Sequence, residues 1–193
     1  MDYAQTAERL NDYRRRIAGL RKEMRQVQAA APPQEVKDYR FKTTAGEIGL
    51  SQLFGDKDAL FVIHNMGTGC PNCTMWADGF NGVLRHLENR AAFVVCSPDD
   101  PETQAAFAAS RGWRFRMVSH EGSSFADDMG YRRDGNWRPG VSVFKRDGAR
   151  ILRVSDSAFD EGDEFCAVWR LFDLLPEGSS GWKARFAYDR SPA

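Results

Sequence analysis

Two cysteines, Cys70 and Cys73, enclose Pro71-Asn72 where a short apolar run gives way to an amphipathic segment. Cysteines at this spacing, at the start of a helix, can form and break a disulfide with little backbone movement. The first helical turn presents unpaired N–H groups and the positive end of the helix dipole, which lower a thiol's pKa and favour the thiolate. Dithiol–disulfide chemistry is therefore the leading interpretation of this motif.

The two thiols are expected to have different roles. Cys70 lies at or before the predicted helix start, so it should be the more exposed and more activated thiol and the attacking nucleophile. Cys73 lies one turn into the helix and should be the resolving thiol. Pro71 suits the first turn because its missing N–H would be unpaired there in any case.

Three further side chains are candidates for supporting roles. Trp76, one turn after Cys73, would either cover the disulfide or anchor the core, and the core role is favoured. Asp78 would either accept the proton of the resolving thiol or be an exposed helix carboxylate, which is the more common situation. His64, six residues before Cys70, would either tune the nucleophile or be a structural histidine.

Two more cysteines lie outside the motif. Cys96 ends a predicted strand parallel to the one before the motif, and parallel strands end at the same edge of a sheet, so Cys96 could lie near the dithiol. The favoured interpretation of Cys96, and of Cys166 on a predicted helix, is a small buried hydrophobe.

The elements that must position the dithiol follow from the apolar pattern. Residues 59–64 form a nearly continuous apolar run, typical of a central strand that is covered on both faces. One face of the following helix carries apolar residues at offsets of three and four, namely Trp76, Phe80, Val83, Leu84 and Leu87. A second apolar run, 91–96, completes a right-handed strand–helix–strand unit. Cysteines at its strand-to-helix turn are typical of a thioredoxin-like redox site.

The remaining segments predict a mixed α/β domain. Capping, turn and periodicity signals indicate six further elements in chain order. They are a leading hairpin (39–50), a short helical turn (51–54), a helix (101–112), a strand (113–118), a second hairpin (140–154) and a last helix (163–175). Asp147-Gly148 is a strong signal for the second hairpin because this pair fits a two-residue turn.

The N-terminal segment is a charged helix with an apolar seam. The N-terminal seam repeats at alternating steps of three and four and consists of Leu10, Tyr13, Ile17, Leu20, Met24 and Val27. Its packing onto the chain's own domain is slightly favoured over pairing with a second copy in a homodimer. The predicted organisation is an N-terminal helix and linker, a thioredoxin-like domain and a C-terminal tail, over residues 1–33, 34–178 and 179–193.

Composition excludes several classes of function. With 193 residues and 42% hydrophobic content, the chain can bury one sizeable core. Lysine plus arginine residues number 27, as do aspartate plus glutamate residues, so no overall field favours nucleic acid or an anionic membrane. The start of the chain lacks an apolar signal-peptide core, and no segment is apolar enough to span a bilayer. We therefore expect a cytoplasmic protein with mainly reduced thiols and no cofactor.

Three stretches carry a resemblance to a known family, residues 69–82 around the cysteines, 112–115 and 140–144. They resemble a bacterial family of unknown function whose members are predicted dithiol–disulfide oxidoreductases, over roughly residues 36–176 plus the leading helix. The resemblance implies an α/β fold of the thioredoxin-like, peroxiredoxin-style type, with a sheet flanked by helices and an extra N-terminal helix. It also implies a protein or small-molecule disulfide as the substrate, without naming one.

Pro139 adds a second point of resemblance. It precedes the predicted strand 140–144, at the place where thioredoxin-like proteins keep a cis-proline that faces the active-site dithiol. The alternative is an ordinary loop proline, because Arg138-Pro139-Gly140 is plausible turn chemistry by itself. The sequence leaves both interpretations open.

Four other functions were weighed for the cysteine motif, and two of them require motif residues that this sequence lacks. A peroxidase of the peroxiredoxin type would have Thr three residues before its attacking cysteine, but Gly67 precedes Cys70 at that spacing. A c-type haem site requires His directly after Cys73, where Thr74 stands, so haem attachment is excluded. Metal binding through the same cysteine pair is the second interpretation, and a redox sensor that binds a partner is the third.

Overall fold

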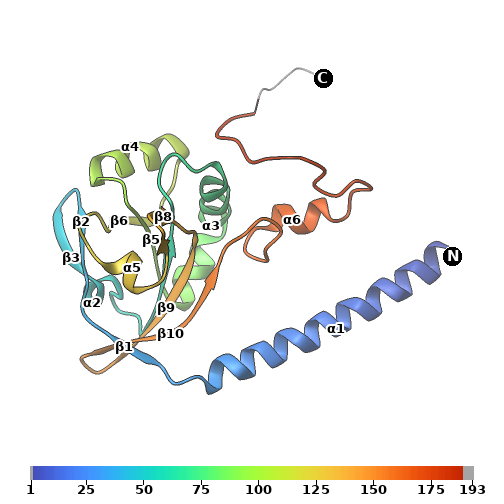
Figure 1. Ribbon diagram of the computed structural model, residues 1–193, viewed down its shortest axis with the longest axis horizontal. Coiled ribbons are helices and arrows are strands. Elements are labelled where there is room, and N and C mark those ends of the chain that lie inside the picture. The colour runs from blue at the N-terminus through green and yellow to red at the C-terminus, as the bar shows by residue number, and fades with distance from the viewer. Residues whose placement is uncertain (1, 189–193) are drawn as a thin grey trace. The chain divides into compact units, whose positions relative to one another are not determined.

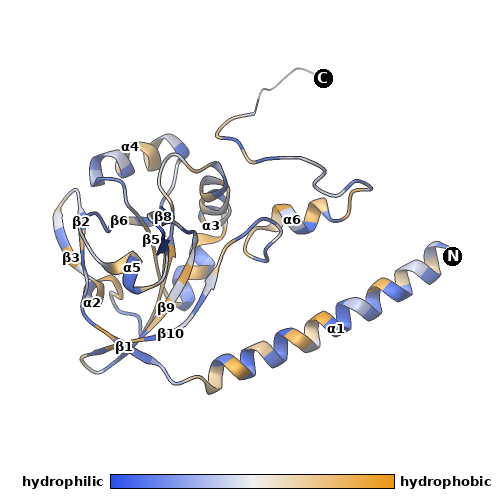
Figure 2. Ribbon diagram, in the orientation of Figure 1, coloured by the Kyte–Doolittle hydropathy of each residue, from blue (hydrophilic) through white to orange (hydrophobic). Residues whose placement is uncertain are grey.

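The computed structural model describes residues 2–188, and the chain divides into two units, Met1–Gln34 and Glu35–Ala193. In the first unit, α1 (Tyr3–Ala30) begins with a capping box: the Asp2 carboxylate accepts the Gln5 N–H at 2.8 Å, and the Gln5 side chain accepts the Asp2 N–H at 3.1 Å. No described residue of α1 is buried, and apolar patches recur along it (Figure 2). The predicted N-terminal helix is confirmed.

An eight-stranded mixed sheet organises the second unit, in the order β1-β10-β9-β4-β5-β6-β2-β3 (Figure 1). Its strands are β1 (Gln34–Val36), β2 (Arg40–Thr43), β3 (Gly46–Gly49), β4 (Ala59–His64), β5 (Ala92–Ser97), β6 (Arg116–Ser119), β9 (Gly140–Asp147) and β10 (Arg150–Ala158). The central strands β4, β5 and β6 are parallel, and β9 runs antiparallel to β4.

Five helices and a small hairpin accompany this sheet. The helices are α2 (Leu50–Leu53), α3 (Pro71–Arg90), α4 (Pro101–Arg111), α5 (Phe125–Asp128) and α6 (Ala167–Phe172). The hairpin pairs β7 (Arg132–Arg133) with β8 (Asn136–Trp137) in a separate two-stranded sheet. None of the helices described, from α1 to α6, has the length and apolar character needed to cross a membrane.

The hydrophobic core lies in two clusters because side chains alternate between the two faces of a strand. On one face, Leu60 and Val62 of β4 pack with apolar residues of α2 and α5. On the other face, Ile63 packs with apolar residues of α3, α4 and α6. Cys70 and Cys73 belong to this second cluster, so the dithiol lies on the face of the sheet that α3 covers.

The structure confirms the predicted strand–helix–strand unit as β4–α3–β5, and both hairpins as β2–β3 and β9–β10. The last helix is shorter than predicted and spans only Ala167–Phe172. Before it, the Asp163 carboxylate accepts the N–H groups of Phe165 at 2.9 Å and Cys166 at 3.3 Å, which holds a turn in place of a helix start at 163.

Candidate functional site

Cys70 and Cys73 lie at the end of the loop that follows β4. Cys70 is the N-cap residue of α3, with extended backbone, and Pro71 occupies the first turn. The backbone N–H of Cys73 donates to Cys70 Sγ at 3.0 Å, while the N–H and hydroxyl of Thr74 donate to the Cys70 carbonyl at 3.1 and 3.0 Å. The sulfur of Cys70 thus pairs with a helix N–H that has no partner within the helix.

These contacts give the two thiols opposite acidities. The pKa of Cys70 is lowered to about 7, chiefly by a hydrogen bond from the Cys73 side chain and also by the backbone N–H groups of Cys73 and Asn72, against the effect of burial. The pKa of Cys73 is raised far above its usual value by the same side-chain hydrogen bond, by burial and by the nearby charge of Cys70. Cys70 is 9% exposed and Cys73 is 3% exposed, and both are free thiols.

Two polar side chains that the sequence analysis did not single out hold the loop before Cys70. Asp99 accepts the Thr68 N–H at 2.9 Å. Asn65 accepts the Gly67 N–H at 2.8 Å. Gly67 has a φ of 102°, and a Cβ there would lie 2.9 Å from the Asp99 carboxylate, so this position requires glycine. Asp99 and Asn65 follow the carboxyl ends of parallel strands, which is the sequence signal that could have found them.

A cavity of about 770 Å³ lies beside the dithiol. Met66, whose N–H donates to Cys73 Sγ at 3.5 Å, and Asn72, which stands between the two cysteines, both line it. The rest of its lining comes from Trp76 of α3, from α5 and the chain after it, from the β7–β8 hairpin and the loop that follows it, and from β10 and the loop after β10. Sequence reasoning missed most of these residues, because they come from loops and strand ends without a periodic pattern.

Trp76 is buried and also lines the cavity. Its ring lies 5.4 Å from that of Phe159, centroid to centroid, and its Nε1–H donates to Asp163 Oδ1 at 3.4 Å. The indole packs in the core, as favoured for Trp76, and also reaches the wall of the cavity, while its covering of the disulfide stays a prediction.

The carboxylate of Asp78 is bound by residues at the end of α4 and just after it. Nε and Nη2 of Arg111 both donate to its carboxylate, and Trp113 Nε1 donates to it at 2.7 Å. The carboxylate therefore ties α3 to the end of α4 and to the chain that leads into β6. Nothing in these contacts brings Asp78 to the resolving thiol.

His64 is buried on the face of the sheet opposite the dithiol. Its Nε2 lies 2.9 Å from Ser142 Oγ, its Nδ1 lies 3.9 Å from Cys96 Sγ, and its ring stacks on Tyr131 at 3.8 Å between centroids. Burial, with the charge of His120 as a second cause, lowers the pKa of His64 well below its usual value. The alternation of β4 explains the placement, because Ile63 and not His64 faces the dithiol cluster.

Cys96 and Cys166 are buried, as favoured for both. Cys96 belongs to the core cluster on the far face of the sheet, so it does not join the dithiol although β4 and β5 end at the same edge. Burial raises the pKa of both thiols. Cys166 lies in the second cluster as the N-cap residue of α6.

Of the two interpretations of Pro139, the cis-proline one is wrong. Every peptide bond among the described residues is trans, including Arg138–Pro139. Pro139 nevertheless lines the same cavity as Asn72 and Trp76. Its carbonyl accepts the N–H of Phe159, the residue after β10, at 3.0 Å, so a main-chain hydrogen bond holds this loop.

Within residues 2–188, no group of three or more His, Cys, Asp or Glu side chains is arranged to hold a metal ion. The dithiol supplies two sulfur ligands, and a closed tetrahedral zinc site requires four ligands.

Comparison with known proteins identifies both a family and a fold. The family model described as "Bacterial protein of unknown function (DUF899)" matches residues 5–188. No curated protein matches the sequence. Among solved structures, reduced Prx3 from Vibrio vulnificus is similar with a TM-score of 0.56 at 13% identity, and the match covers 69% of this chain and 89% of that chain.

Two further solved structures agree. Peroxidoxin BcpB from Mycobacterium tuberculosis has a TM-score of 0.52 at 23% identity and covers 63% of this chain and 84% of that chain. Peroxiredoxin Q from Xanthomonas campestris has a TM-score of 0.53 at 17% identity, covering 62% of this chain and 78% of that chain. The predicted thioredoxin-like, peroxiredoxin-style α/β fold is confirmed, and at these identities the likeness concerns the fold alone.

Proposed function

This chain belongs to the DUF899 family of bacterial proteins of unknown function, and we propose that it is a thiol–disulfide oxidoreductase acting through Cys70 and Cys73. The observation that carries the proposal is the N-cap hydrogen bond of 3.0 Å from the Cys73 N–H to Cys70 Sγ. With a pKa of about 7, Cys70 carries a substantial thiolate fraction at neutral pH, whereas an ordinary cysteine is mostly protonated.

The first step is attack of the Cys70 thiolate on one sulfur of a substrate disulfide. A new S–S bond forms between Cys70 and that sulfur, the S–S bond of the substrate breaks, and the other substrate sulfur leaves as a thiolate that takes a proton from water. The result is a mixed disulfide between the enzyme and one half of the substrate.

The second step is attack of Cys73 on Cys70 Sγ. Two causes that raise the pKa of Cys73, its hydrogen bond to Cys70 and the charge of Cys70, disappear once Cys70 is bound in the mixed disulfide. Cys73 then loses its proton more readily, forms the Cys70–Cys73 disulfide and releases the second substrate thiol. The substrate gains two electrons and two protons, and the enzyme loses them.

The rival functions use the same residues. Metal binding would need ligands beyond the pair, and the described residues contain no such group around it. A redox sensor would use the same two steps but would pass the signal to a partner protein. Repeated reduction of a substrate disulfide would separate an enzyme from such a sensor.

Trapping of the first intermediate tests the proposal. Cys73→Ser keeps the nucleophile but removes the resolving thiol, so it should accumulate a mixed disulfide with a model disulfide, seen as one added substrate half in the intact mass. Cys70→Ser should add nothing, and Cys166→Ser, a buried cysteine outside the motif, should resolve normally. Equal trapping by the two motif variants would overturn the assignment of roles.

A further inference from the structure

The cavity beside the dithiol has a charged lining that is only partly neutralised within the protein. Eight of its lining residues are ionic: Asp127, Asp128, Arg133, Arg138, Arg153, Asp156, Asp160 and Glu161. Several of these are paired, since Arg153 bonds Asp156 at 3.1 Å, Asp128 bonds Lys37 at 3.1 Å and Asp127 lies 3.7 Å from Arg132. The remaining charges lie on two separate segments.

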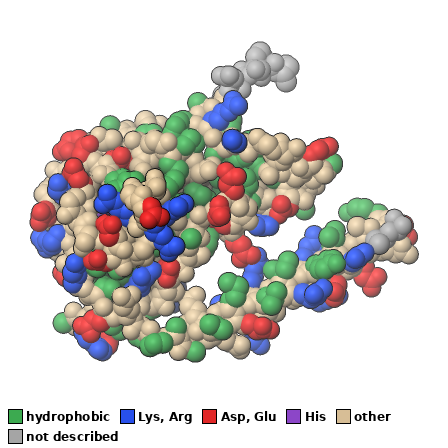
Figure 3. All heavy atoms as spheres, viewed as in Figure 1, with side chains coloured by type: hydrophobic (Ala, Val, Ile, Leu, Met, Phe, Trp, Pro, Cys, Tyr) green, Lys and Arg blue, Asp and Glu red, His purple; other side chains and the backbone are tan. Residues whose placement is uncertain are grey.

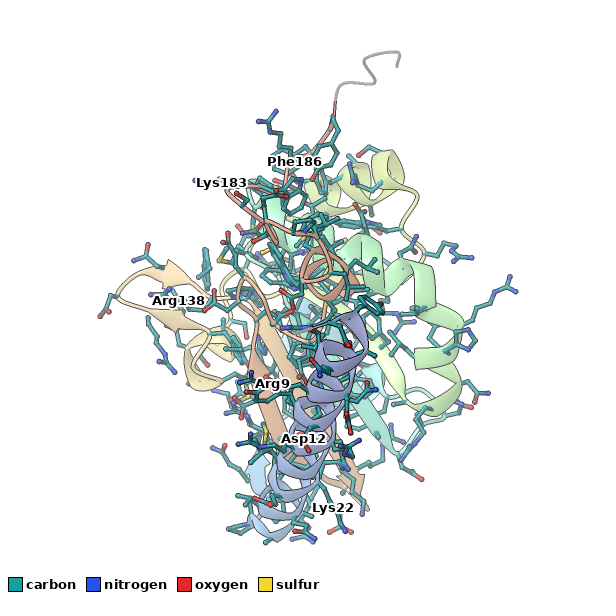
Figure 4. All side chains as sticks on the ribbon, turned by 90° about the vertical axis from the view of Figure 1, so that its right-hand side faces the viewer. Arg9, Asp12, Lys22, Arg138, Lys183 and Phe186 are labelled. Atoms are coloured by element: carbon teal, nitrogen blue, oxygen red, sulfur yellow. The ribbon has the colours of Figure 1, made fainter. Side chains whose placement is uncertain are left out.

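Two arginines supply the unneutralised positive charge. Arg138 is exposed and makes no hydrogen bond or ion pair through its side chain within residues 2–188. Figure 4 shows it where the β7–β8 hairpin meets the rest of the domain. Arg133 on β7 donates through Nε to the Gly130 carbonyl at 3.2 Å and has no carboxylate partner among the described residues. Their guanidinium groups are therefore available to a carboxylate.

Two carboxylates supply the negative charge, from the loop after β10. Glu161 accepts the side-chain N–H of Asn72 at 3.3 Å, which places this carboxylate next to the residue between the two cysteines. Asp160 accepts the Glu161 N–H at 2.8 Å. Neither carboxylate has a cationic partner among the described residues, so both are available to an ammonium group. In Figure 3, basic and acidic side chains stand side by side over the region of the hairpin.

Between the two charged segments the lining is apolar. Met66, Trp76, Pro139 and Phe159 contribute this part, and Met66 contacts the sulfur of Cys73 through its N–H. A ligand that fits would carry a carboxylate and an ammonium group around a central apolar or sulfur-containing portion. The volume of about 770 Å³ falls within the range of small-molecule pockets, roughly 300 to 1,000 Å³.

We propose that the substrate is a low-molecular-weight zwitterionic disulfide, that is, the disulfide of an amino acid or a short peptide. This inference rests on the proposed oxidoreductase function. Arg138 and Arg133 bind its carboxylate groups, and Glu161 and Asp160 bind its ammonium groups. The apolar lining receives the disulfide itself next to the start of α3. Cys70 and Cys73 then reduce it to two thiols in the two steps given above, with the enzyme as the reductant.

The test uses the reduced full chain in single turnover against four small disulfides. They are 3,3′-dithiodipropionate with two carboxylates, cystamine with two ammonium groups, cystine with both, and uncharged bis(2-hydroxyethyl) disulfide. The second-order rate constant for oxidation of the dithiol is followed by acid quench, alkylation and intact mass. Because the four compounds differ in the pKa of the leaving thiol, each is compared between variants and not with the other compounds.

The two charge-removing variants are each expected to lower the rate constant with a different charged disulfide. For each variant, the rate constant with a charged disulfide is divided by its rate constant with bis(2-hydroxyethyl) disulfide. In Arg138→Gln this ratio should fall about tenfold below that of the wild type for dithiodipropionate and for cystine, the loss expected for one charge-assisted hydrogen bond. Glu161→Gln should lose a similar factor with cystamine and cystine. Arg116→Gln, a matched control for an exposed arginine on β6 outside the cavity, should change neither ratio.

The outcomes separate the inference from the function beneath it. If Arg138→Gln and Glu161→Gln leave all four rate constants unchanged, or lower all four by the same factor, the zwitterionic substrate is refuted while the oxidoreductase stands. If the wild-type chain reduces none of the four, including the uncharged one, and no protein disulfide either, the oxidoreductase itself is refuted.

Discussion

Cys70 acts as the cap of α3 with its own sulfur, and this single residue combines a structural and a chemical role. A thiolate accepts an N–H better than a thiol does, so the free helix terminus stabilises the reactive form. Cys73 contributes twice, through its backbone N–H and through its S–H. The asymmetry of the two pKa values follows from these hydrogen bonds, from burial and from the charge of Cys70.

The acidity of Cys70 predicts a pH profile. The thiolate is the form that iodoacetamide alkylates, so the rate at Cys70 should rise with pH around a midpoint of about 7. Cys73→Ala removes the S–H donor, which is the largest cause of the lowered pKa, so its midpoint should move upward. Cys166→Ala should keep the midpoint of the wild type. An unchanged midpoint in Cys73→Ala would contradict the Cys73 S–H as the main cause of the lowered Cys70 pKa.

At the scale of single residues, the sequence predicted the dithiol and its order but not its surroundings. The spacing of Cys70 and Cys73 and the proline between them define a helix start by local rules. The orientation of His64 depends on which face of β4 it occupies. Because residues 59–64 are nearly all apolar, the sequence shows no alternation that would tell the two faces apart. The partners of Asp78 escaped prediction for a different reason, because Arg111 and Trp113 lie more than thirty residues further along the chain.

At the scale of elements, β9 must pass closely behind the wall of the cavity. A Cβ on Gly140 would lie 2.2 Å from the Tyr131 ring and 2.6 Å from the Ser157 carbonyl. Tyr131 in turn stacks on His64 and donates its hydroxyl to the Val141 carbonyl at 3.1 Å. The first residue of β9 therefore fixes how the cavity wall joins the central sheet.

This close approach predicts the effect of one methyl group. Gly140→Ala should lower the free energy of unfolding by about 1–3 kcal/mol, the usual cost of overpacking a well-packed site. Gly79→Ala is the matched control, because a Cβ there meets open space on helix α3 and should stabilise by about 0.5–1 kcal/mol. Urea unfolding measures both. A Gly140→Ala chain as stable as the wild type would show that the wall is not rigid.

The elements that could be predicted are those with a strong local signal. Apolar runs gave β4 and β5, periodicity gave α3, and Asp147-Gly148 marked the β9–β10 turn, where Gly148 has a φ of 59°. The β7–β8 hairpin escaped prediction because each strand has two residues and no pattern can be read from so few. Much of the cavity lining comes from loops, short elements and strand ends that likewise have no periodic pattern. The sequence therefore could not predict which charged residues line the cavity.

At the scale of the whole molecule, the N-terminal seam on α1 supplies no residue to the proposed redox chemistry. Its six residues are 44% to 73% exposed on α1, which is charged elsewhere, as the labelled Arg9, Asp12 and Lys22 in Figure 4 illustrate. We propose that the seam pairs two copies of the chain. A parallel pair would set Arg9 near Arg14 of the other copy, and an antiparallel pair in which all six seam residues meet would set Arg16 near Glu23.

Sedimentation of the full chain tests this pairing. The wild type should sediment as a dimer, and Ile17→Glu should produce the monomer because it sets a charge in the middle of the seam. Lys22→Glu changes a charge on the same helix away from the seam and should leave the dimer intact. A monomeric wild type, or a dimer that tolerates Ile17→Glu, would refute the proposed pairing.

The central claim is that Cys70 and Cys73 form one redox couple, and its most direct test is equilibration of the chain in a series of glutathione redox buffers. Acid quench, alkylation of free thiols and peptide mass mapping then give the oxidised fraction of each cysteine. We predict that Cys70 and Cys73 convert together, as one two-electron disulfide, while the buried Cys96 and Cys166 stay reduced throughout. Oxidation that leaves Cys70 and Cys73 unpaired, or that links either of them to Cys96 or Cys166, would contradict the account.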